Sequence, residues 1–193
     1  MEENVRLLLT ELESWGVQND AVATERSEKM LNLEPDTARF LSLLVQHGKH
    51  NRLLEVGTSN GYSTIWLAWS AKQTGGHLIS IEHNSAKHTL AQANLERAGL
   101  QQYVTLLLGD ATQILGELKG SFDFIFLDAD RRHYLQRMSL LLPLLSAGSL
   151  LLADNVRSHP EEIDPYLRAI EANANFQHNV VGVGKGLSVA LKL

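Results

Sequence analysis

A chain of 193 residues that is 44% hydrophobic and 20% charged has the composition of one ordinary globular domain. Its 17 basic and 22 acidic residues give a net charge of −5, which disfavours nucleic acid as a partner without excluding RNA. The absence of cysteine excludes disulfides, thiolate metal sites and a cysteine nucleophile, and it fits a reducing cytoplasm.

Nothing in the sequence predicts export or membrane insertion. The N-terminus is acidic and has no basic region of the kind that begins a signal peptide. The most apolar stretch, residues 139–153, is too short for a membrane span and is broken by Pro143 and Gly148. We therefore expect a cytoplasmic protein without a membrane anchor.

The N-terminal segment, residues 1–50, is expected to be helical. Apolar residues recur at three- and four-residue spacing over 4–15 and 35–48, which is typical of amphipathic helices. The apolar segment 27–33 is taken as a further short helix. Because these segments carry more apolar residues than a solvent-facing arm needs, we expect part of their surface to meet another subunit.

Residues 51–193 are expected to form an α/β core within the same single domain. The expected strands are 52–57, 77–83, 103–110, 122–129 and 148–155, and the expected helices between them are 62–73, 85–99 and 131–145. Strands that alternate with helices predict a doubly wound parallel sheet covered on both faces. In the tail, 179–193, two strand-like runs flank Gly-Lys-Gly, a connection too short for a parallel crossover, so we expect an antiparallel hairpin.

The turn after the first expected strand has the features of a ligand site. Gly57 and Gly61 frame it, and backbone without side chains lets a ligand approach closely. Ser63 follows near a helix N-terminus, where free N–H groups favour an anion such as a carboxylate. Glu82 ends the second expected strand, where a carboxylate can accept hydrogen bonds from two ribose hydroxyls. Glycine is nevertheless common in any turn between a strand and a helix.

Two nucleotide cofactors compete for this turn. NAD favours Gly-x-Gly-x-x-Gly, in which the middle glycine admits the pyrophosphate, but this chain has Ser59 at that position. Glu55 lies two residues before Gly57 and could pair with an ammonium group, directly or through water. S-adenosylmethionine carries an ammonium, a carboxylate and a ribose, so we favour it over NAD.

A second group of polar residues follows the fourth and fifth expected strands: Asp128, Asp154 and Asn155. The carboxyl ends of neighbouring parallel strands meet at one edge of a sheet, beside the expected cofactor. Two buried carboxylates require a cation or hydrogen bonds, and an all-oxygen set suits Mg²⁺, Ca²⁺ or Mn²⁺ rather than zinc. In the alternative, Asp128 binds cofactor or caps a helix, and the other two residues form a turn.

These motifs, in this order, resemble the cation-dependent small-molecule O-methyltransferases, which include catechol and caffeoyl-CoA O-methyltransferases. The residues that carry the resemblance are LLEVGTSNGYST (53–64), SIEH (80–83), GDA (109–111), FDFIFLDAD (122–130) and LLADN (151–155). The resemblance implies a Rossmann-like sheet with a reversed final hairpin and a homodimer. It also implies methyl transfer from S-adenosylmethionine to a hydroxyl of a small, vicinal dihydroxy aromatic acceptor, assisted by a divalent cation, in the first place Mg²⁺.

The resemblance also assigns roles by motif position. It assigns five residues to the methionine part of the cofactor: Leu33 through its backbone, Glu55, Gly57, Thr58 and Ser63. It assigns three more to the rest of the cofactor: Glu82 on the ribose, Ala111 beside the adenine, and Asp128 at the border with the acceptor. The metal ligands that it implies are Asp128, Asp154 and Asn155.

One residue departs from the family pattern, which often has lysine three residues after the first metal aspartate. This chain has Arg131 there, and arginine, unlike lysine, cannot lose its proton and act as a base. Arg131 could steady an anionic acceptor, or it could face solvent together with Arg132. If a base is needed, His133 or His159 is available. The candidate catalytic residues are Asp128, Arg131 and His159.

The sequence does not identify the molecule that accepts the methyl group. The segment after the fifth strand, 157–166, is short and suggests an open site for a catechol, a flavonoid, a CoA ester or a modified RNA base. An NAD-binding oxidoreductase would want a third glycine in the turn. A tRNA-modifying methyltransferase on the same fold is disfavoured by the net acidity, and a non-catalytic cofactor-binding protein would leave the acidic pair unexplained.

Overall fold

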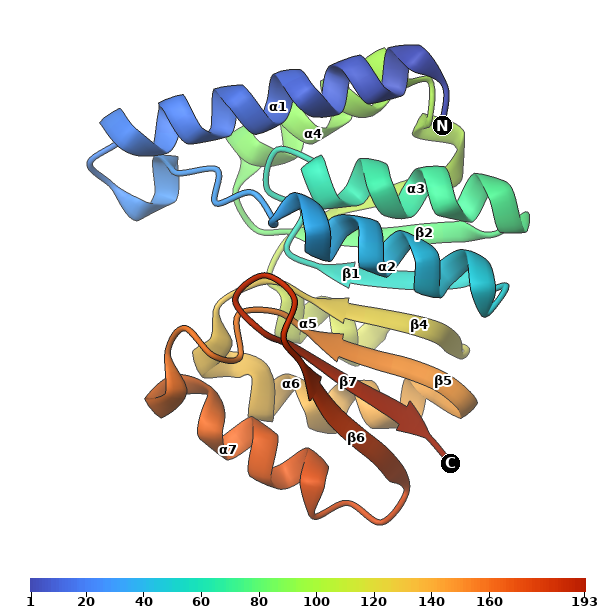
Figure 1. Ribbon diagram of the computed structural model, residues 1–193. Helices are drawn as coiled ribbons and strands as arrows, with labels where there is room; N and C mark the ends of the chain where they lie inside the picture. The colour runs from blue at the N-terminus through green and yellow to red at the C-terminus, as the bar shows by residue number, and fades with distance from the viewer.

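The computed structural model describes residues 1–193, and a seven-stranded sheet runs through its centre (Figure 1). The strands, in the order β3-β2-β1-β4-β5-β7-β6, are β1 (Arg52–Val56), β2 (His77–Glu82), β3 (Val104–Leu108), β4 (Phe122–Leu127), β5 (Leu145–Ala153), β6 (Phe176–Val181) and β7 (Leu187–Lys192). The first five strands pair in parallel, whereas β7 pairs antiparallel with both β5 and β6. The predicted doubly wound sheet with an antiparallel C-terminal hairpin is therefore confirmed.

Helices cover both faces of this sheet (Figure 1). One face carries α1 (Glu3–Val22), α2 (Pro35–His47), α3 (Tyr62–Thr74) and α4 (Ser85–Ala98). The other face carries α5 (Ala111–Glu117), α6 (Tyr134–Leu141) and α7 (Pro160–Glu171). Short 3₁₀ turns occupy Arg26–Glu28, Gln101–Tyr103, Arg131–His133 and Leu142–Leu144. None of the helices combines the length and the apolar character needed to cross a membrane.

Alternate side chains of the central strands build two separate cores. Leu53 and Phe124 point toward α1–α4, whereas their neighbours Leu54 and Ile125 point toward α5–α7. All four side chains are fully buried. Because both faces of β1 and β4 are covered, consecutive residues such as Leu53–Leu54 and Phe124–Ile125 are apolar, and Glu55 is the buried polar exception.

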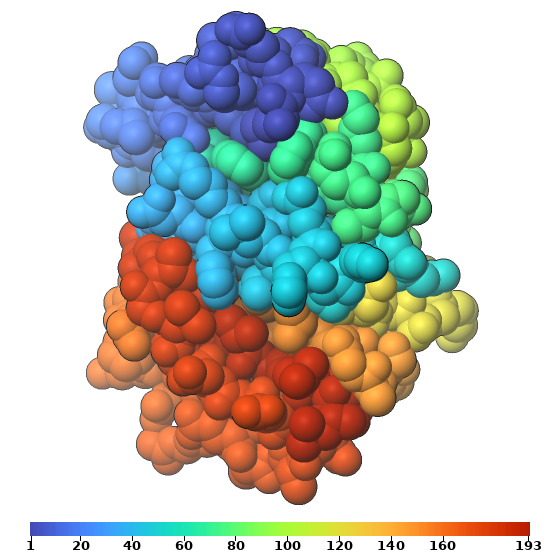
Figure 2. Space-filling view, turned by 45° about the vertical axis from the view of Figure 1, so that its right-hand side comes forward, coloured from blue at the N-terminus to red at the C-terminus, as the bar shows by residue number.

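Helix α1 belongs to the first of these cores. Figure 2 shows the N-terminal segment in blue lying directly against the neighbouring helices. Its buried side chains are Val5, Leu8, Leu9 and Leu12. The Tyr62 hydroxyl of α3 also donates a hydrogen bond of 2.6 Å to Glu13 of α1. These four side chains pack within the chain and are not available to another subunit. Other apolar side chains of the same segment are exposed, among them Leu7, Val17 and Val22, so the subunit contact stays a prediction.

Residues 27–33 do not form the helix that the sequence predicts. After the 3₁₀ turn Arg26–Glu28 the chain has no regular secondary structure as far as α2. The Asp20 carboxylate accepts hydrogen bonds from the Met30 and Leu31 amides at 2.6 and 2.8 Å. A side chain that binds these amides competes with helix formation, and Leu31 adopts a left-handed conformation with φ of 51°. At the end of this segment Leu33 is buried.

The region after β5 also differs from the expectation of a short open loop over 157–166. Helix α7 begins at Pro160 and occupies most of it. Proline suits the first position of a helix because its missing N–H would have no partner there. Glu161 and Glu162 in the first turn favour the same start through the helix dipole.

Candidate functional site

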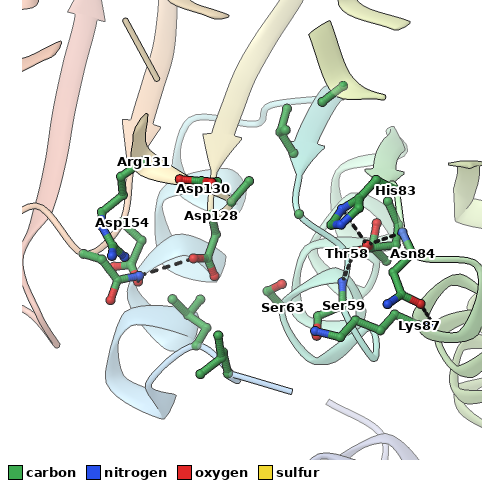
Figure 3. Close-up of a pocket in the computed structure, with 18 of the residues that line it drawn as sticks. Thr58, Ser59, Ser63, His83, Asn84, Lys87, Asp128, Asp130, Arg131 and Asp154 are labelled. Carbon is green, nitrogen blue, oxygen red and sulfur yellow. Dashed lines mark hydrogen bonds and ion pairs between the residues drawn. The ribbon is translucent and has the colours of Figure 1, made fainter. Parts of the chain in front are cut away.

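The carboxyl ends of the parallel strands border a cavity of about 860 Å³ (Figure 3). The cavity lies where the strand order reverses between β1 and β4, and its volume is typical of a cofactor site. The predicted site residues that line it are Leu33, Gly57, Thr58, Ser63, Glu82, Ala111, Asp128, Arg131, Asp154, Asn155 and His159. Figure 3 shows Asp128, Asp154 and Arg131 at one end and Ser59, Asn84 and Lys87 at the other.

The two glycines of the β1–α3 turn are needed for contacts within the chain. Gly57 has φ of 109°, and a Cβ atom there would lie 2.0 Å from the Asp128 carbonyl oxygen. Gly61 has φ of 89°, and its Cβ would lie 3.2 Å from the Cα of Ala91 on α4. Positive φ and close packing thus account for both glycines. The close approach of a ligand, which the sequence suggested, is not required to explain them.

Glu55 lies behind this turn and is fully buried. One of its carboxylate oxygens accepts a hydrogen bond from the Ser63 hydroxyl, and the other accepts from the Thr64 and Ser80 hydroxyls, each at 2.6 Å. Among the predicted site residues it is the one that does not line the cavity. The structure therefore does not support direct pairing of Glu55 with a ligand ammonium, and the visible role of this carboxylate is to orient Ser63.

We expect Glu55 to make stability depend on pH. Burial raises its pKa to about 7 from an ordinary 4.5, although the three hydroxyl hydrogen bonds oppose the shift. The folded chain therefore holds a proton that the unfolded chain releases, so this stability is complete below the unfolded pKa and is lost as pH rises through the folded pKa. A shift of this size corresponds to about 3 kcal/mol.

Urea unfolding at about pH 4.5 and pH 8 measures this effect when the wild type is compared with Glu55→Gln. The wild type should lose about 3 kcal/mol more than the variant over this interval, because glutamine does not titrate. The same loss in both proteins would show that Glu55 is not the titrating group.

Glu82 holds the turn from the opposite side. Its two oxygens accept hydrogen bonds from the amides of Ser59 and Asn84, both at 2.8 Å, and its side chain is 5% exposed. A carboxylate has room for about four hydrogen bonds, so acceptor capacity remains for ligand hydroxyls. This geometry is compatible with the ribose contact that the sequence suggests.

The acidic residues meet where β4 and β5 end. The Asn155 amide donates hydrogen bonds to Asp154 at 2.7 Å and to Asp128 at 3.3 Å. Asp154 is 1% exposed, and its Oδ1 atom is buried without a hydrogen-bond partner. Burial raises the pKa of both carboxyl groups, and the neighbouring charge of Asp154 raises that of Asp128 further. Ionising the pair therefore calls for a compensating positive charge.

These three residues fit a divalent cation by the chemistry of their donor atoms. Hard cations such as Mg²⁺ and Ca²⁺ take oxygen ligands, and the unpartnered Oδ1 of Asp154 is one. An asparagine amide has nearly the same shape when it is flipped, so Asn155 can present oxygen in place of nitrogen. The chain has no group of three or more His, Cys, Asp or Glu side chains that could hold a metal, so a cation here would need the Asn155 amide as its third side-chain ligand.

The sequence left open whether Arg131 faces the site or, together with Arg132, faces solvent. The Arg131 side chain is 8% exposed, and its Nε and Nη2 atoms lie 3.0 Å from one Glu162 oxygen on α7. The solvent-facing alternative is thus wrong for Arg131, whose partner stands in a helix that the sequence did not predict. Arg132 is exposed and pairs with Asp130.

Both candidate histidines line the cavity, but they differ in their contacts. His159 is exposed at the start of α7, and its Nδ1 atom lies 3.0 Å from the Ser158 hydroxyl. The Nε2 atom of His133 lies 3.9 Å from the Asp130 carboxylate. No structural feature here distinguishes either residue as a base.

Four cations that the sequence analysis did not single out also line the cavity: Arg26, Lys87, Arg137 and Lys185. Lys185 lies in the β6–β7 loop, and its Nζ atom is 2.7 Å from Glu34. Its positive charge opposes the rise that burial causes in the pKa of Asp128 and of Asp154. The only sequence signal for it was Gly-Lys-Gly, which was interpreted as a turn.

The chain is similar to known proteins over most of its length. Residues 8–187 match a family model described as O-methyltransferase. A catechol O-methyltransferase of Niastella koreensis is 37% identical over 151 residues, which are 73% of this chain and 68% of that protein. A catechol O-methyltransferase of Mycobacterium tuberculosis is 35% identical over 119 residues, which are 61% of this chain and 54% of that protein.

Solved structures agree with this similarity. An O-methyltransferase from Bacillus cereus, in complex with S-adenosylhomocysteine, superimposes with a TM-score of 0.82 at 26% identity. The superposition covers 96% of this chain and 90% of that one. By contrast, the match to the M. tuberculosis relative extends over little more than half of that protein, 54% of its length.

Proposed function

We propose, since this chain belongs to the O-methyltransferase family, that it methylates one hydroxyl of a vicinal dihydroxy aromatic with the help of a divalent cation, in the first place Mg²⁺. Because it belongs to this family, the chain is an S-adenosylmethionine-dependent enzyme. It is therefore neither an NAD-binding oxidoreductase nor a non-catalytic protein, two alternatives that the sequence had left open. The observation that carries the finer proposal is the Asp128–Asp154–Asn155 cluster with its unpartnered carboxylate oxygen. The names of two relatives, both catechol O-methyltransferases, point to the same acceptor class.

We place the cofactor along the cavity wall formed by the β1–α3 turn. Ser63, oriented by Glu55, lies in the first turn of α3, where backbone N–H groups lack helical partners and can receive a carboxylate. Glu82 stands at the far end of the turn for the ribose, and Ala111 begins α5 for the adenine. Thr58 and the Leu33 backbone complete the methionine end in this proposal.

Methyl transfer from a sulfonium is an in-line displacement, in which the acceptor oxygen bonds to the methyl carbon as the sulfur–carbon bond breaks. A divalent cation, when bound, lowers the pKa of the acceptor hydroxyl and orients it. In our proposal Asp128, Asp154 and Asn155 hold that cation at the edge of the sheet. Arg131, fixed by Glu162, places a positive charge beside the acceptor oxygen as it becomes anionic. In the same proposal His159, the candidate base of the sequence analysis, lines the cavity and receives the hydroxyl proton.

Assembly as a homodimer remains a prediction of the resemblance. The buried side chains of α1 do not add to it, because they pack within the chain. A tRNA substrate has no specific observation in its favour.

Paired acceptors test the proposed activity. With S-adenosylmethionine and Mg²⁺, we expect methylation of a catechol and little or none of the matching monohydroxy phenol, because only the catechol offers two oxygens to one cation. Mass spectrometry of the product measures both, with an unmodified tRNA transcript as a third acceptor. Equal methylation of the phenol, or methylation of the tRNA alone, would contradict the proposal.

A further inference from the structure

Arg137 is a buried cation without a partner in the chain. It lies on α6, lines the cavity and is 7% exposed. Its Nε and Nη1 atoms are buried and make no hydrogen bond. Arg131, which is buried to the same extent, is held by Glu162 at 3.0 Å. The two arginines are therefore equally buried, but only Arg131 has a hydrogen-bonding partner in the chain.

Such a group is costly unless something else binds it. Burial lowers the pKa of the Arg137 guanidinium, while the charges of Asp110 and Asp130 oppose that shift. A buried guanidinium with unpaired N–H groups has lost its hydration without gaining hydrogen bonds in return, which destabilises the folded chain. Because Arg137 lines the cavity, a ligand in the cavity can supply the missing acceptor.

The surrounding charges indicate what kind of ligand this is. Asp130 is already paired with Arg132, and the negative charge of Asp110 acts on Arg137 although the two side chains form no ion pair. This end of the cavity therefore has no excess positive charge that would select a phosphate or a carboxylate. Asp110 accepts a hydrogen bond from the Gln113 amide through one oxygen at 2.9 Å, which leaves its second oxygen as an acceptor.

A donor and an acceptor thus stand at the same end of the cavity. The edge of an aminopurine offers the complementary pair, an amino group that donates beside a ring nitrogen that accepts. We propose that Arg137 donates a hydrogen bond to the adenine ring nitrogen next to the amino group of the cofactor, while Asp110 accepts from that amino group. This proposal rests on the proposed placement of the cofactor, with its adenine beside Ala111. Arg137 is then a residue that determines specificity for the base.

Calorimetric titration with S-adenosylhomocysteine compares the wild type with Arg137→Met, whose long unbranched side chain fills similar space. We expect the variant to bind about tenfold or more weakly, because it lacks a charge-assisted hydrogen bond. The ligand-free variant should melt at the same or a higher temperature, because it no longer buries an unpaired charge. Arg168→Met is the matched control, since Arg168 is exposed and pairs with Asp164 on α7; it should leave affinity unchanged.

Two base analogues separate a direct contact from a structural role. The 7-deaza and 1-deaza forms of S-adenosylhomocysteine each lack one of the ring nitrogens beside the amino group. The wild type should bind one of them about tenfold more weakly than the parent compound, and Arg137→Met should bind that analogue and the parent alike. The same analogue penalty in both proteins, or no penalty in the wild type, would overturn the inference. Failure of the wild type to bind the parent compound would instead contradict the placement of the cofactor.

Discussion

Asp154→Ala should reduce methyl transfer by about a thousandfold or more, because a bound divalent cation contributes several kcal/mol to stabilisation of the transition state. Asp154 is fully enclosed at the end of β5, and its free Oδ1 atom is the best-placed ligand in the acidic cluster. Affinity for S-adenosylhomocysteine should change little, because the proposed function places Asp154 beside the acceptor rather than beside the cofactor. Initial rates with a catechol acceptor and calorimetric titration measure the two effects separately.

Asp164→Ala is the matched control for this variant. Asp164 is a half-exposed aspartate on α7 whose only ion pair is with Arg168 at 2.6 Å. Such surface pairs contribute little, so turnover should match the wild type. Retained S-adenosylhomocysteine binding shows that the Asp154 variant is folded. Wild-type turnover by Asp154→Ala, with its fold intact, would contradict a role for this carboxylate in holding a cation.

Gly57→Ala should lower the free energy of unfolding by about 3–5 kcal/mol, the sum expected from a forbidden backbone conformation and from overpacking. A Cβ atom at this position would lie 2.0 Å from the Asp128 carbonyl oxygen, and φ is 109°. The obstacle is backbone, which cannot move aside as a side chain can. Because Asp128 is the first residue after β4, any relaxation should also displace the acidic cluster.

Gly116→Ala provides the contrasting case in urea unfolding. Gly116 lies within α5, and a Cβ atom there would meet no atom within 4 Å. Alanine is the better helix former, so this variant should be more stable by up to about 1 kcal/mol. If Gly57→Ala were as stable as the wild type, the close passage of the turn beside Asp128 would be wrong.

Much of the sheet could be predicted from local patterns. Buried parallel strands need apolar side chains on both faces, so β1, β2 and β4 are plain in the sequence. The final hairpin followed from the shortness of the Gly-Lys-Gly connection. The helix expected over 27–33 was wrong because the carboxylate of Asp20, in α1, captures the amides of Met30 and Leu31. That contact depends on how the chain folds back and not on the apolar pattern of the segment.

The candidate site was predictable to the extent that topology determines it. Parallel strands present their carboxyl ends at one edge, so Glu82, Asp128 and Asp154 were expected near one another, and they line one cavity. The partners of individual side chains were not predictable. The Ser63, Thr64 and Ser80 hydroxyls around Glu55 come from two elements, and Arg137 reaches the cavity through the packing of α6 beside α5.

The requirement for a divalent cation tests the central claim, that Asp128, Asp154 and Asn155 hold a cation needed for methyl transfer. Enzyme stripped with a chelator is assayed on the catechol acceptor, and Mg²⁺ or Mn²⁺ is then restored in excess. The account predicts that activity falls to background in chelator and returns with the cation, while S-adenosylhomocysteine binding stays constant throughout. Full methyl transfer in the presence of chelator would contradict it.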